Sequence, residues 1–154
     1  MSQTISFHYD VPGDDFTRAG EASSSIKKAL KQVGLAPDII RNVAIAMYEG
    51  EINMVIHAGG GQIDVDIDPD AVRMVLKDQG PGIKDISLAM QEGWSTAPDD
   101  VRSLGFGAGM GLPNMKKYTD SMQIDTVLGV GTTIMSSLTP ATLAGIAFIR
   151  TEDG

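Results

Sequence analysis

The chain has 154 residues, of which 42% are hydrophobic and 21% are charged, and this composition predicts one soluble globular domain with its own core rather than two domains. It contains no cysteine, which excludes disulfides, thiolate metal sites and cysteine nucleophiles. The net charge of −8 argues against a nucleic-acid-binding surface, which needs a basic footprint, and fits a protein partner.

The first part of the chain predicts one strand and two helices. Residues 4–9 alternate apolar and polar side chains, as a half-buried strand does. Residues 16–33 carry an apolar stripe at helical spacing, and Gly34 is expected to end that helix. A second helix is expected from about Pro37, a residue that suits a first helical turn, to His57, after which a run of glycines turns the chain.

Four further strands follow. Residues 62–68 and 72–78 alternate apolar and polar side chains across a short turn, and residues 122–127 and 132–138 form a final hairpin. Sequential strands joined by short turns imply a mainly antiparallel sheet with the helices on one face. The expected fold class is therefore an α+β two-layer sandwich with a mainly antiparallel, mixed sheet.

Between these strands the sequence predicts two more helices and a loop. A short helix is expected near residues 86–90 and another over residues 112–118, with a polar, proline-containing mobile loop at residues 93–105. The C-terminal segment, residues 141–154, is too apolar for a free tail. It could pack on the domain, mediate formation of a homodimer or receive a partner, and the sequence does not choose among these.

Two glycine-rich loops carry most of the functional information. The first runs Asp78-Gln-Gly80-Pro-Gly82-Ile83, and the second runs Gly107-Ala108-Gly109-Met110-Gly111-Leu112. Glycine suits such loops because the backbone reaches positive φ and approaches a ligand without a Cβ in the way. The Asp78 carboxylate is an acceptor that an adenine amino group could use. The pair predicts a nucleotide pocket that is neither a Rossmann nor a Walker site, since neither fingerprint is present.

Glu49 and Asn53 lie four residues apart on the second predicted helix, so their side chains stack about one turn apart on one face. A carboxylate and an amide oxygen can serve there as general base and magnesium ligand. Alone, such a pair is more often a solvated polar pair, and the glycine loops that follow favour the functional interpretation. Glu51, about 200° around the helix from Glu49, is expected to face solvent or a partner. The sequence gives no reason for Gly50, which weakens a helix by up to about 1 kcal/mol relative to alanine.

The order of these motifs resembles a known family. Glu49 and Asn53, the two glycine loops and the stretch Gly129-Val-Gly-Thr-Thr133 are together similar to the ATP-binding domain of gyrase, Hsp90, histidine kinases and MutL, the GHKL superfamily with the Bergerat fold. Within it, the chain is most similar to the small bacterial anti-sigma-factor serine/threonine kinases and the related stressosome switch kinase. That closer similarity rests on residues 51–63, 85–96 and 109–120.

The resemblance implies a histidine-kinase-like ATP-binding domain over residues 1–140, with ATP and magnesium as cofactors. It gives Glu49 the role of catalytic base and Asn53 that of metal ligand, and it makes residues 93–105 the lid over the phosphates. Thr132 would support adenine beside Asp78, directly or through water. The implied nucleotide-binding residues are Asp78, Gly80, Gly82, Ile83, Gly107, Ala108, Gly109, Met110, Gly111, Leu112 and Thr132.

The same resemblance implies an ATP-binding anti-sigma regulatory factor with serine/threonine protein kinase activity, whose substrate is a small anti-sigma-factor antagonist (STAS) domain and which can also bind a sigma factor. The alternative is a non-catalytic, ATP-dependent partner-switching module that sequesters a sigma factor or activates a phosphatase. Glu49 favours the kinase, because a pure binder would not need that base. No nucleic acid or membrane partner is expected, and the lack of a long apolar run or signal-peptide pattern favours the cytoplasm.

Overall fold

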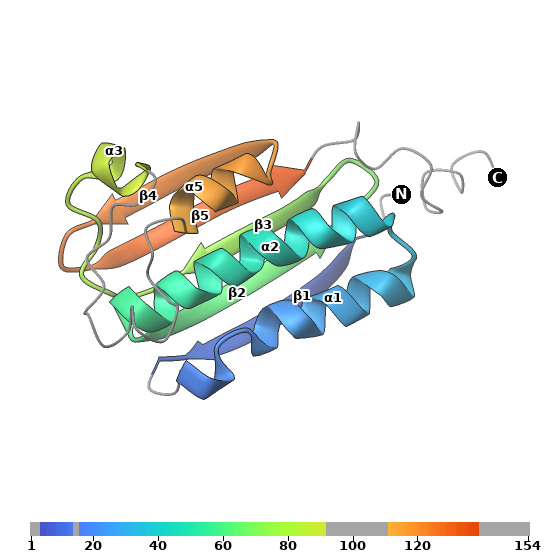
Figure 1. The fold of residues 1–154 in the computed structure, drawn as a ribbon, viewed down its shortest axis with the longest axis horizontal. Coiled ribbons are helices and arrows are strands. Elements are labelled where there is room, and N and C mark those ends of the chain that lie inside the picture. The colour runs from blue at the N-terminus through green and yellow to red at the C-terminus, as the bar shows by residue number, and fades with distance from the viewer. Residues whose placement is uncertain (1–3, 14–15, 92–110, 139–154) are drawn as a thin grey trace.

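A five-stranded sheet with helices on one face makes up the fold, as the computed structural model shows for residues 4–13, 16–91 and 111–138 (Figure 1). The strands are β1 (Ile5–Pro12), β2 (Gly60–Ile67), β3 (Val72–Lys77), β4 (Ser121–Val127) and β5 (Gly131–Leu138). They lie in the order β1-β2-β3-β5-β4, and each neighbouring pair is antiparallel. The predicted fold class is confirmed. The predicted tail at residues 141–154 lies outside the described residues.

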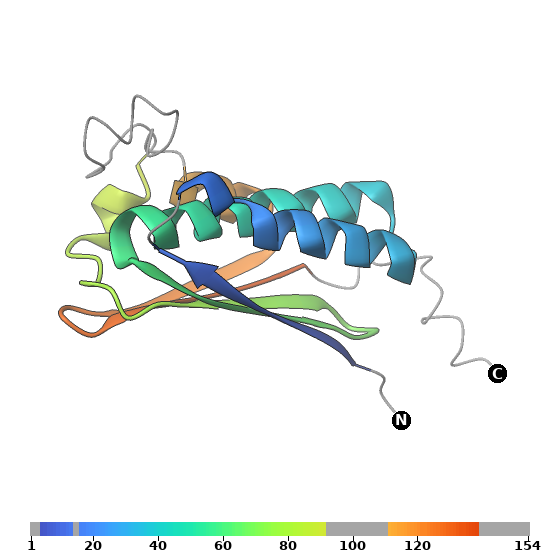
Figure 2. The same cartoon turned by 90° about the horizontal axis from the view of Figure 1, so that it is seen from below.

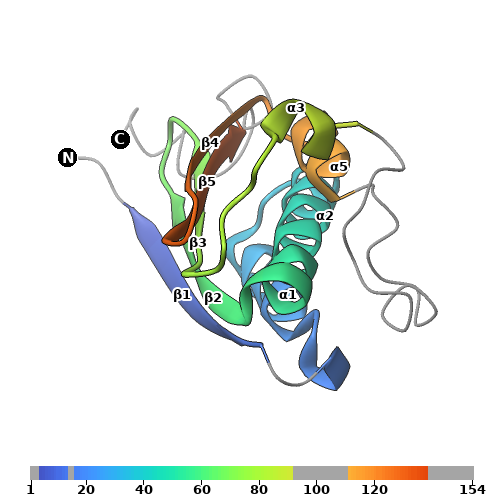
Figure 3. The same cartoon turned by 90° about the vertical axis from the view of Figure 1, so that its left-hand side faces the viewer.

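The helices that the structure describes lie together on one side of the sheet (Figures 2 and 3). They are the 3-10 helix η1 (Phe16–Arg18), α1 (Glu21–Val33), α2 (Pro37–Asn53), the π-helix η2 (Met54–Ala58), α3 (Ile86–Ala89) and α5 (Gly111–Lys117). The long helices α1 and α2 run side by side, and α5 packs against α2. In the described part of the chain, no helix has the length and apolar character that crossing a membrane requires.

The core fills the space between the helices and the sheet. Alternate residues of β2, such as Ile63 and Val65, are fully buried beneath α2, while Asp64 between them points to solvent. On the open face Asp64 pairs across the strands with His8, whose Nδ1 lies 2.6 Å from the Asp64 carboxylate. This alternation is what fixes the strand register, because a slip by one residue would bury the acidic side chains.

The first predicted helix is interrupted at Gly20. Residues 16–33 were expected to form one helix, but η1 ends at Arg18 and α1 begins at Glu21. Gly20 adopts a φ of 100°, a left-handed conformation that an α-helix does not accommodate. The ring of Tyr48 packs over it, since a Cβ built on Gly20 would lie 3.2 Å from the ring carbon Cε1. The apolar stripe therefore continues across a break that the spacing alone did not reveal.

Glu51 corrects a second expectation, because its side chain is 1% exposed and does not face solvent. Its carboxylate accepts hydrogen bonds from the backbone N–H of Gly20, Ala22 and Ser23 at 2.9, 3.1 and 3.1 Å, and from the Ser23 hydroxyl at 3.0 Å. The first amides of a helix have no partner within the helix, and they favour a negative charge. Glu51 is therefore the cap of α1, supplied from α2 rather than from α1's own sequence.

Gly50 is explained by close packing. A Cβ at this position would lie 2.2 Å from Leu76 Cδ2 and 3.2 Å from Met115 Cε. Leu76 belongs to β3 and Met115 to α5, and both are buried. A glycine here lets α2 approach the sheet and α5 at the same point, which outweighs its cost in helix propensity.

Candidate functional site

The last turns of α2 carry Glu49 and Asn53, both partly buried. After Asn53 the helix widens into the π-helix η2, which ends at Gly59 with a φ of 70°. Single π turns occur frequently at functional sites. This one brings Ala58 against the first glycine loop, where a Cβ built on Gly80 would lie 2.6 Å from that of Ala58. The loop can approach the end of the helix because Gly80 has no side chain.

Glu49 is held by a residue of α5. Asn114 Nδ2 donates a hydrogen bond to Glu49 Oε2 at 3.3 Å. Burial raises the pKa of the Glu49 carboxyl above its ordinary value, and the Asn114 hydrogen bond opposes that rise. A raised pKa makes the carboxylate a stronger proton acceptor once it is ionised, as a general base requires.

Asp78 organises the first glycine loop. Its backbone N–H donates to the Thr132 carbonyl oxygen at 2.9 Å, just beyond the end of β3. Its Oδ1 accepts hydrogen bonds from the backbone N–H of Gly80 at 2.9 Å and of Thr132 at 3.2 Å. Among the residues that the structure describes, none donates to its other carboxylate oxygen. One oxygen of Asp78 thus holds the first glycine loop against the start of β5.

Thr132 and Thr126 tie the loop to the β4–β5 hairpin. Thr132 is 7% exposed, and its hydroxyl lies 2.9 Å from that of Thr126, its partner across the hairpin. The Thr126 hydroxyl also accepts a hydrogen bond from the Ile83 backbone N–H at 2.9 Å. Sequence analysis missed Thr126, whose position opposite Thr132 follows from the observed pairing of β4 with β5.

The remaining glycine of the first loop, Gly82, has a φ of 83°, and a Cβ there would lie 2.8 Å from the Val127 carbonyl oxygen. A side chain at Gly82 would therefore meet both backbone strain and a clash with the hairpin. The loop and the hairpin tip are also joined by a hydrogen bond from the Gly129 N–H to the Pro81 carbonyl oxygen at 2.9 Å. Close packing at Gly82 and the hydrogen bond at Pro81 therefore both hold the first loop against the β4–β5 hairpin.

Only the end of the second glycine loop falls within the described residues. Gly111 begins α5 and packs on Asn53, because a Cβ built on Gly111 would lie 2.8 Å from Asn53 Nδ2 and 2.9 Å from Oδ1. Leu112 is 7% exposed and joins the core. The last residue of the second loop, Gly111, therefore lies against Asn53, the predicted metal ligand. Outside the described residues lie Gly107, Ala108, Gly109, Met110 and the predicted lid at residues 93–105.

The structure thus brings three segments to one place: the end of α2, the loop after β3 and the first turn of α5. Within residues 4–13, 16–91 and 111–138, no three histidine or acidic side chains are grouped so as to hold a metal ion. A magnesium ion that binds together with a nucleotide needs only one or two protein oxygens, because phosphates and water complete its shell. The Asn53 amide oxygen beside Gly111 fits that requirement. The glycines at positions 80, 82 and 111 let the loops pack closely on Ala58, Val127 and Asn53.

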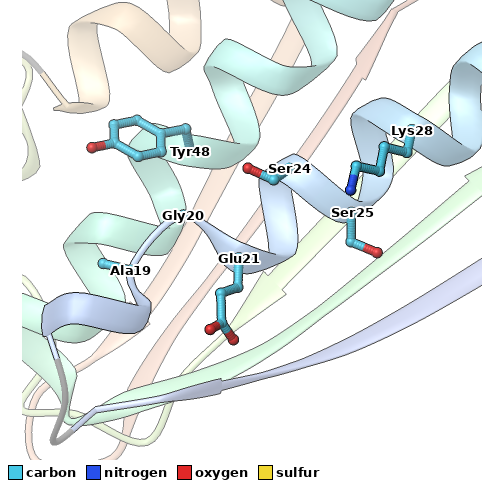
Figure 4. A pocket seen from close by; sticks show the side chains of 7 residues that line it. All are labelled: Ala19, Gly20, Glu21, Ser24, Ser25, Lys28 and Tyr48. Atoms are coloured by element: carbon cyan, nitrogen blue, oxygen red, sulfur yellow. The ribbon is translucent and has the colours of Figure 1, made fainter.

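A separate hollow of about 500 Å3 lies where the start of α1 meets α2 (Figure 4). Tyr48 borders it from α2, one residue before Glu49. Its lining is Ala19, Gly20, Glu21, Ser24, Ser25, Lys28 and Tyr48. None of these residues was predicted as a site residue, and the hollow is distinct from the glycine loops.

Comparison with known proteins gives a family match and two close groups of relatives. The model of the histidine kinase-like ATPase domain matches residues 14–137. The serine/threonine-protein kinase RsbT of Bacillus subtilis is 31% identical over 114 residues, which cover 71% of this chain and 80% of RsbT. An anti-sigma F factor of Clostridium beijerinckii is 32% identical over 104 residues, which cover 64% of this chain and 69% of that protein.

Two solved structures share the fold. The mycobacterial sensor histidine kinase MprB aligns with a TM-score of 0.52 at 19% identity, covering 88% of this chain and 97% of that one. The RsbU and RsbW domains of Rv1364c from Mycobacterium tuberculosis align with a TM-score of 0.55 at 16% identity, covering 88% of this chain and 32% of that longer chain. At these identities the likeness supports the architecture alone.

Proposed function

Because the chain belongs to the histidine kinase-like ATPase family, with RsbT and anti-sigma F factors among its relatives, we propose that it is an anti-sigma regulatory factor with serine/threonine kinase activity. In this proposal it binds ATP with magnesium in the cytoplasm and phosphorylates a small anti-sigma-factor antagonist (STAS) domain. The acidic net charge of −8 is consistent with a protein partner rather than a nucleic acid.

One observation carries the proposal: at the end of α2, Asn53 lies against Gly111, where the second glycine loop ends, and Glu49 accepts a hydrogen bond from Asn114 of the same helix α5. That arrangement puts a proton acceptor one helical turn from a hard-oxygen ligand, beside the start of a helix that follows a glycine loop. Phosphoryl transfer depends mainly on positioning and on charge stabilisation, and these are the parts it needs.

Each residue then has a stated task. Bound ATP with magnesium supplies the phosphoryl group. Asp78 receives the adenine amino group on the carboxylate oxygen that does not hold the loop. The Asn53 amide oxygen holds the metal ion. The Glu49 carboxylate takes the proton from the substrate hydroxyl, at Oε1 because Oε2 is engaged by Asn114.

The second candidate is an ATP-dependent binding module that sequesters a sigma factor or activates a phosphatase without phosphorylating its partner. Its support is the relation to anti-sigma F factors. The half-buried Glu49, whose pKa is raised by burial, is not needed for binding alone and favours the kinase.

The deciding experiment compares wild type, Glu49→Gln and Asn53→Ala with a purified antagonist domain. Glu49→Gln keeps the shape and removes the proton acceptor, so ATP should bind while phosphoryl transfer falls by about 100-fold or more. Asn53→Ala should lose the magnesium-dependent part of ATP affinity together with transfer. Asp38→Asn, an exposed carboxylate change in the first turn of the same helix, is the matched control.

The possible outcomes separate the two candidates. Transfer by Glu49→Gln at the wild-type rate would remove the base from the mechanism. A wild type that binds both ATP and the partner but never modifies it would establish the binding module instead. Co-purification from the native host, with mass spectrometry of partners and their phosphosites, identifies the substrate to use.

A further inference from the structure

The side chain of Asn114 on α5 reaches Glu49 and donates a hydrogen bond to it. It stands three residues after Gly111, and therefore about one turn into the helix that the second glycine loop leads into. Neither the glycine motif nor the pairing of Glu49 with Asn53 assigns it a task. Its amide is partly buried against α2, where a polar group without a partner would be costly.

The chemistry of the contact is specific. An amide N–H is a neutral donor, so it can hold a carboxylate oxygen without forming an ion pair that would weaken the base. The bond goes from Asn114 Nδ2 to Glu49 Oε2, which leaves Oε1 as the oxygen available to a substrate hydroxyl. A glutamate side chain otherwise has several rotatable bonds, and fixing one oxygen also fixes the direction of the other.

We propose that Asn114 is a positioning residue for Glu49: it holds Oε2, directs Oε1 toward the substrate hydroxyl, and connects the base to the helix that follows the second glycine loop. This inference rests on the proposed phosphoryl transfer for its consequences in catalysis. The contact itself, and its effect on the carboxyl group, do not depend on that activity.

The titratable groups near Glu49 do not substitute for the Asn114 amide in this role. On α2 itself, Tyr48 is a neighbour whose own pKa is raised by burial and by the charges of Glu49 and Glu51, and the Glu51 carboxylate is taken up by the start of α1. On α5, Lys116 and Lys117 are exposed. In the described part of the chain, the Asn114 amide is the group that hydrogen-bonds Glu49 and lowers its pKa.

The first test reads the carboxyl group directly and needs no activity. Glu49 is titrated by carbon-13 NMR of its side-chain carboxyl in wild type, Asn114→Leu and Asn114→Ser, each in the full chain. Asn114→Leu keeps the size and removes the donor, so the Glu49 pKa should move further above its ordinary value. Asn114→Ser retains a donor and should move it less. An unchanged Glu49 titration in Asn114→Leu would overturn the inference.

The second test uses phosphoryl transfer to the antagonist domain. In Asn114→Leu the acidic limb of the profile of kcat against pH should shift to higher pH, because the Glu49 carboxylate must lose its proton to act as a base. At neutral pH, kcat should fall about tenfold with little change in KM for ATP. Gln123→Leu, which removes an exposed amide on the open face of the sheet, is the control and should keep the wild-type profile.

The two tests distinguish a failure of the inference about Asn114 from a failure of the proposed kinase function. A wild type without transfer contradicts the proposed function, and the NMR titration still decides the contact. A wild type that transfers, with an unshifted acidic limb in Asn114→Leu, contradicts the positioning role. If Asn114→Leu does not fold, Asn114→Ser and Asn114→Ala provide the same comparison, with and without a donor.

Discussion

Glu49 and Glu51 stand two residues apart on α2, yet their carboxylates serve opposite sides of the helix. The Glu49 carboxylate accepts a hydrogen bond from Asn114 on α5. The Glu51 carboxylate is buried against the start of α1 and accepts hydrogen bonds from the backbone amides there. One helix turn therefore carries the candidate base on one side and the anchor of a neighbouring helix on the other. Changes at these two positions should have different effects.

Glu51→Ala should destabilise the fold. It would leave the Gly20, Ala22 and Ser23 amides without their acceptor in a buried site, at a cost of about 2–4 kcal/mol in the free energy of unfolding. Urea denaturation measures it. Glu21→Gln, an exposed change in the first turn of α1, is the control and should cost less than about 1 kcal/mol. A Glu51→Ala protein as stable as that control would contradict the capping role.

Asp78→Asn and Asp78→Ala should separate the two tasks of Asp78. The asparagine amide oxygen can still accept from the Gly80 and Thr132 amides, while its NH2 group replaces the free oxygen. We expect wild-type stability and a loss of ATP affinity of roughly 10- to 100-fold. Asp78→Ala should lose both affinity and stability. Calorimetric titration with ATP, with GTP as comparison and Asp125→Asn as control, checks this, and unchanged ATP affinity in Asp78→Asn would refute the adenine assignment.

Gly50→Ala should destabilise the protein although alanine favours helices. The added methyl would fall 2.2 Å from Leu76 Cδ2, so we expect a net cost of about 1–3 kcal/mol despite a gain in helix propensity of up to about 1 kcal/mol. Leu76→Val removes the clashing methyl. The double variant should therefore be less destabilised than the sum of the two single variants, in thermal or urea unfolding. If the two destabilisations simply add, the contact with Leu76 is not the reason for a glycine at position 50.

Asp68 gives a pH-dependent prediction at the β2–β3 turn. Burial works to raise its pKa, but hydrogen bonds from the Asp70 and Ala71 amides and from Arg73 outweigh it, and the pKa is lowered. A lowered folded-state pKa gives stability that is present above the unfolded-state pKa and is lost as the pH falls through the folded one. Asp68→Asn should be less stable than wild type at neutral pH, and the difference should disappear in acid. A constant difference across pH would contradict this.

Much of the fold could be predicted from the sequence because strand alternation and turn chemistry are local. The five strands, their antiparallel pairing and the helices on one face follow from patterns within a few residues. The misses depend on contacts between distant segments. The break at Gly20 and the burial of Glu51 arise together, since the carboxylate that caps α1 comes from another helix.

The candidate site was predictable in its residue types and less so in its connections. Glycines at positions 80, 82 and 111 are explained by backbone that approaches its neighbours too closely for a Cβ. Asn114 and Thr126 carry no motif of their own, and their contacts with Glu49 and with Thr132 and Ile83 appear only once α5 and the hairpin are placed. The catalytic and binding roles of these residues remain predictions.

The position of β1 at the edge of the sheet has a consequence for the order of folding. Among the described strands, β1 pairs with β2 alone, joining Pro12 to Gly60 and Ile5 to Ile67. The pairs β2–β3 and β4–β5 are instead joined by short turns. Closing a loop of about fifty residues costs more entropy than closing a hairpin, so β1 should dock after α1 and α2 have shortened that path. The same edge should be the first to open, which native-state hydrogen exchange would register as weaker protection in β1 than in β3. The pairing of β3 with β5, which joins Lys77 to Thr133, closes a loop of similar length. These two long-range closures should therefore be slow, while the β2–β3 and β4–β5 hairpins form early.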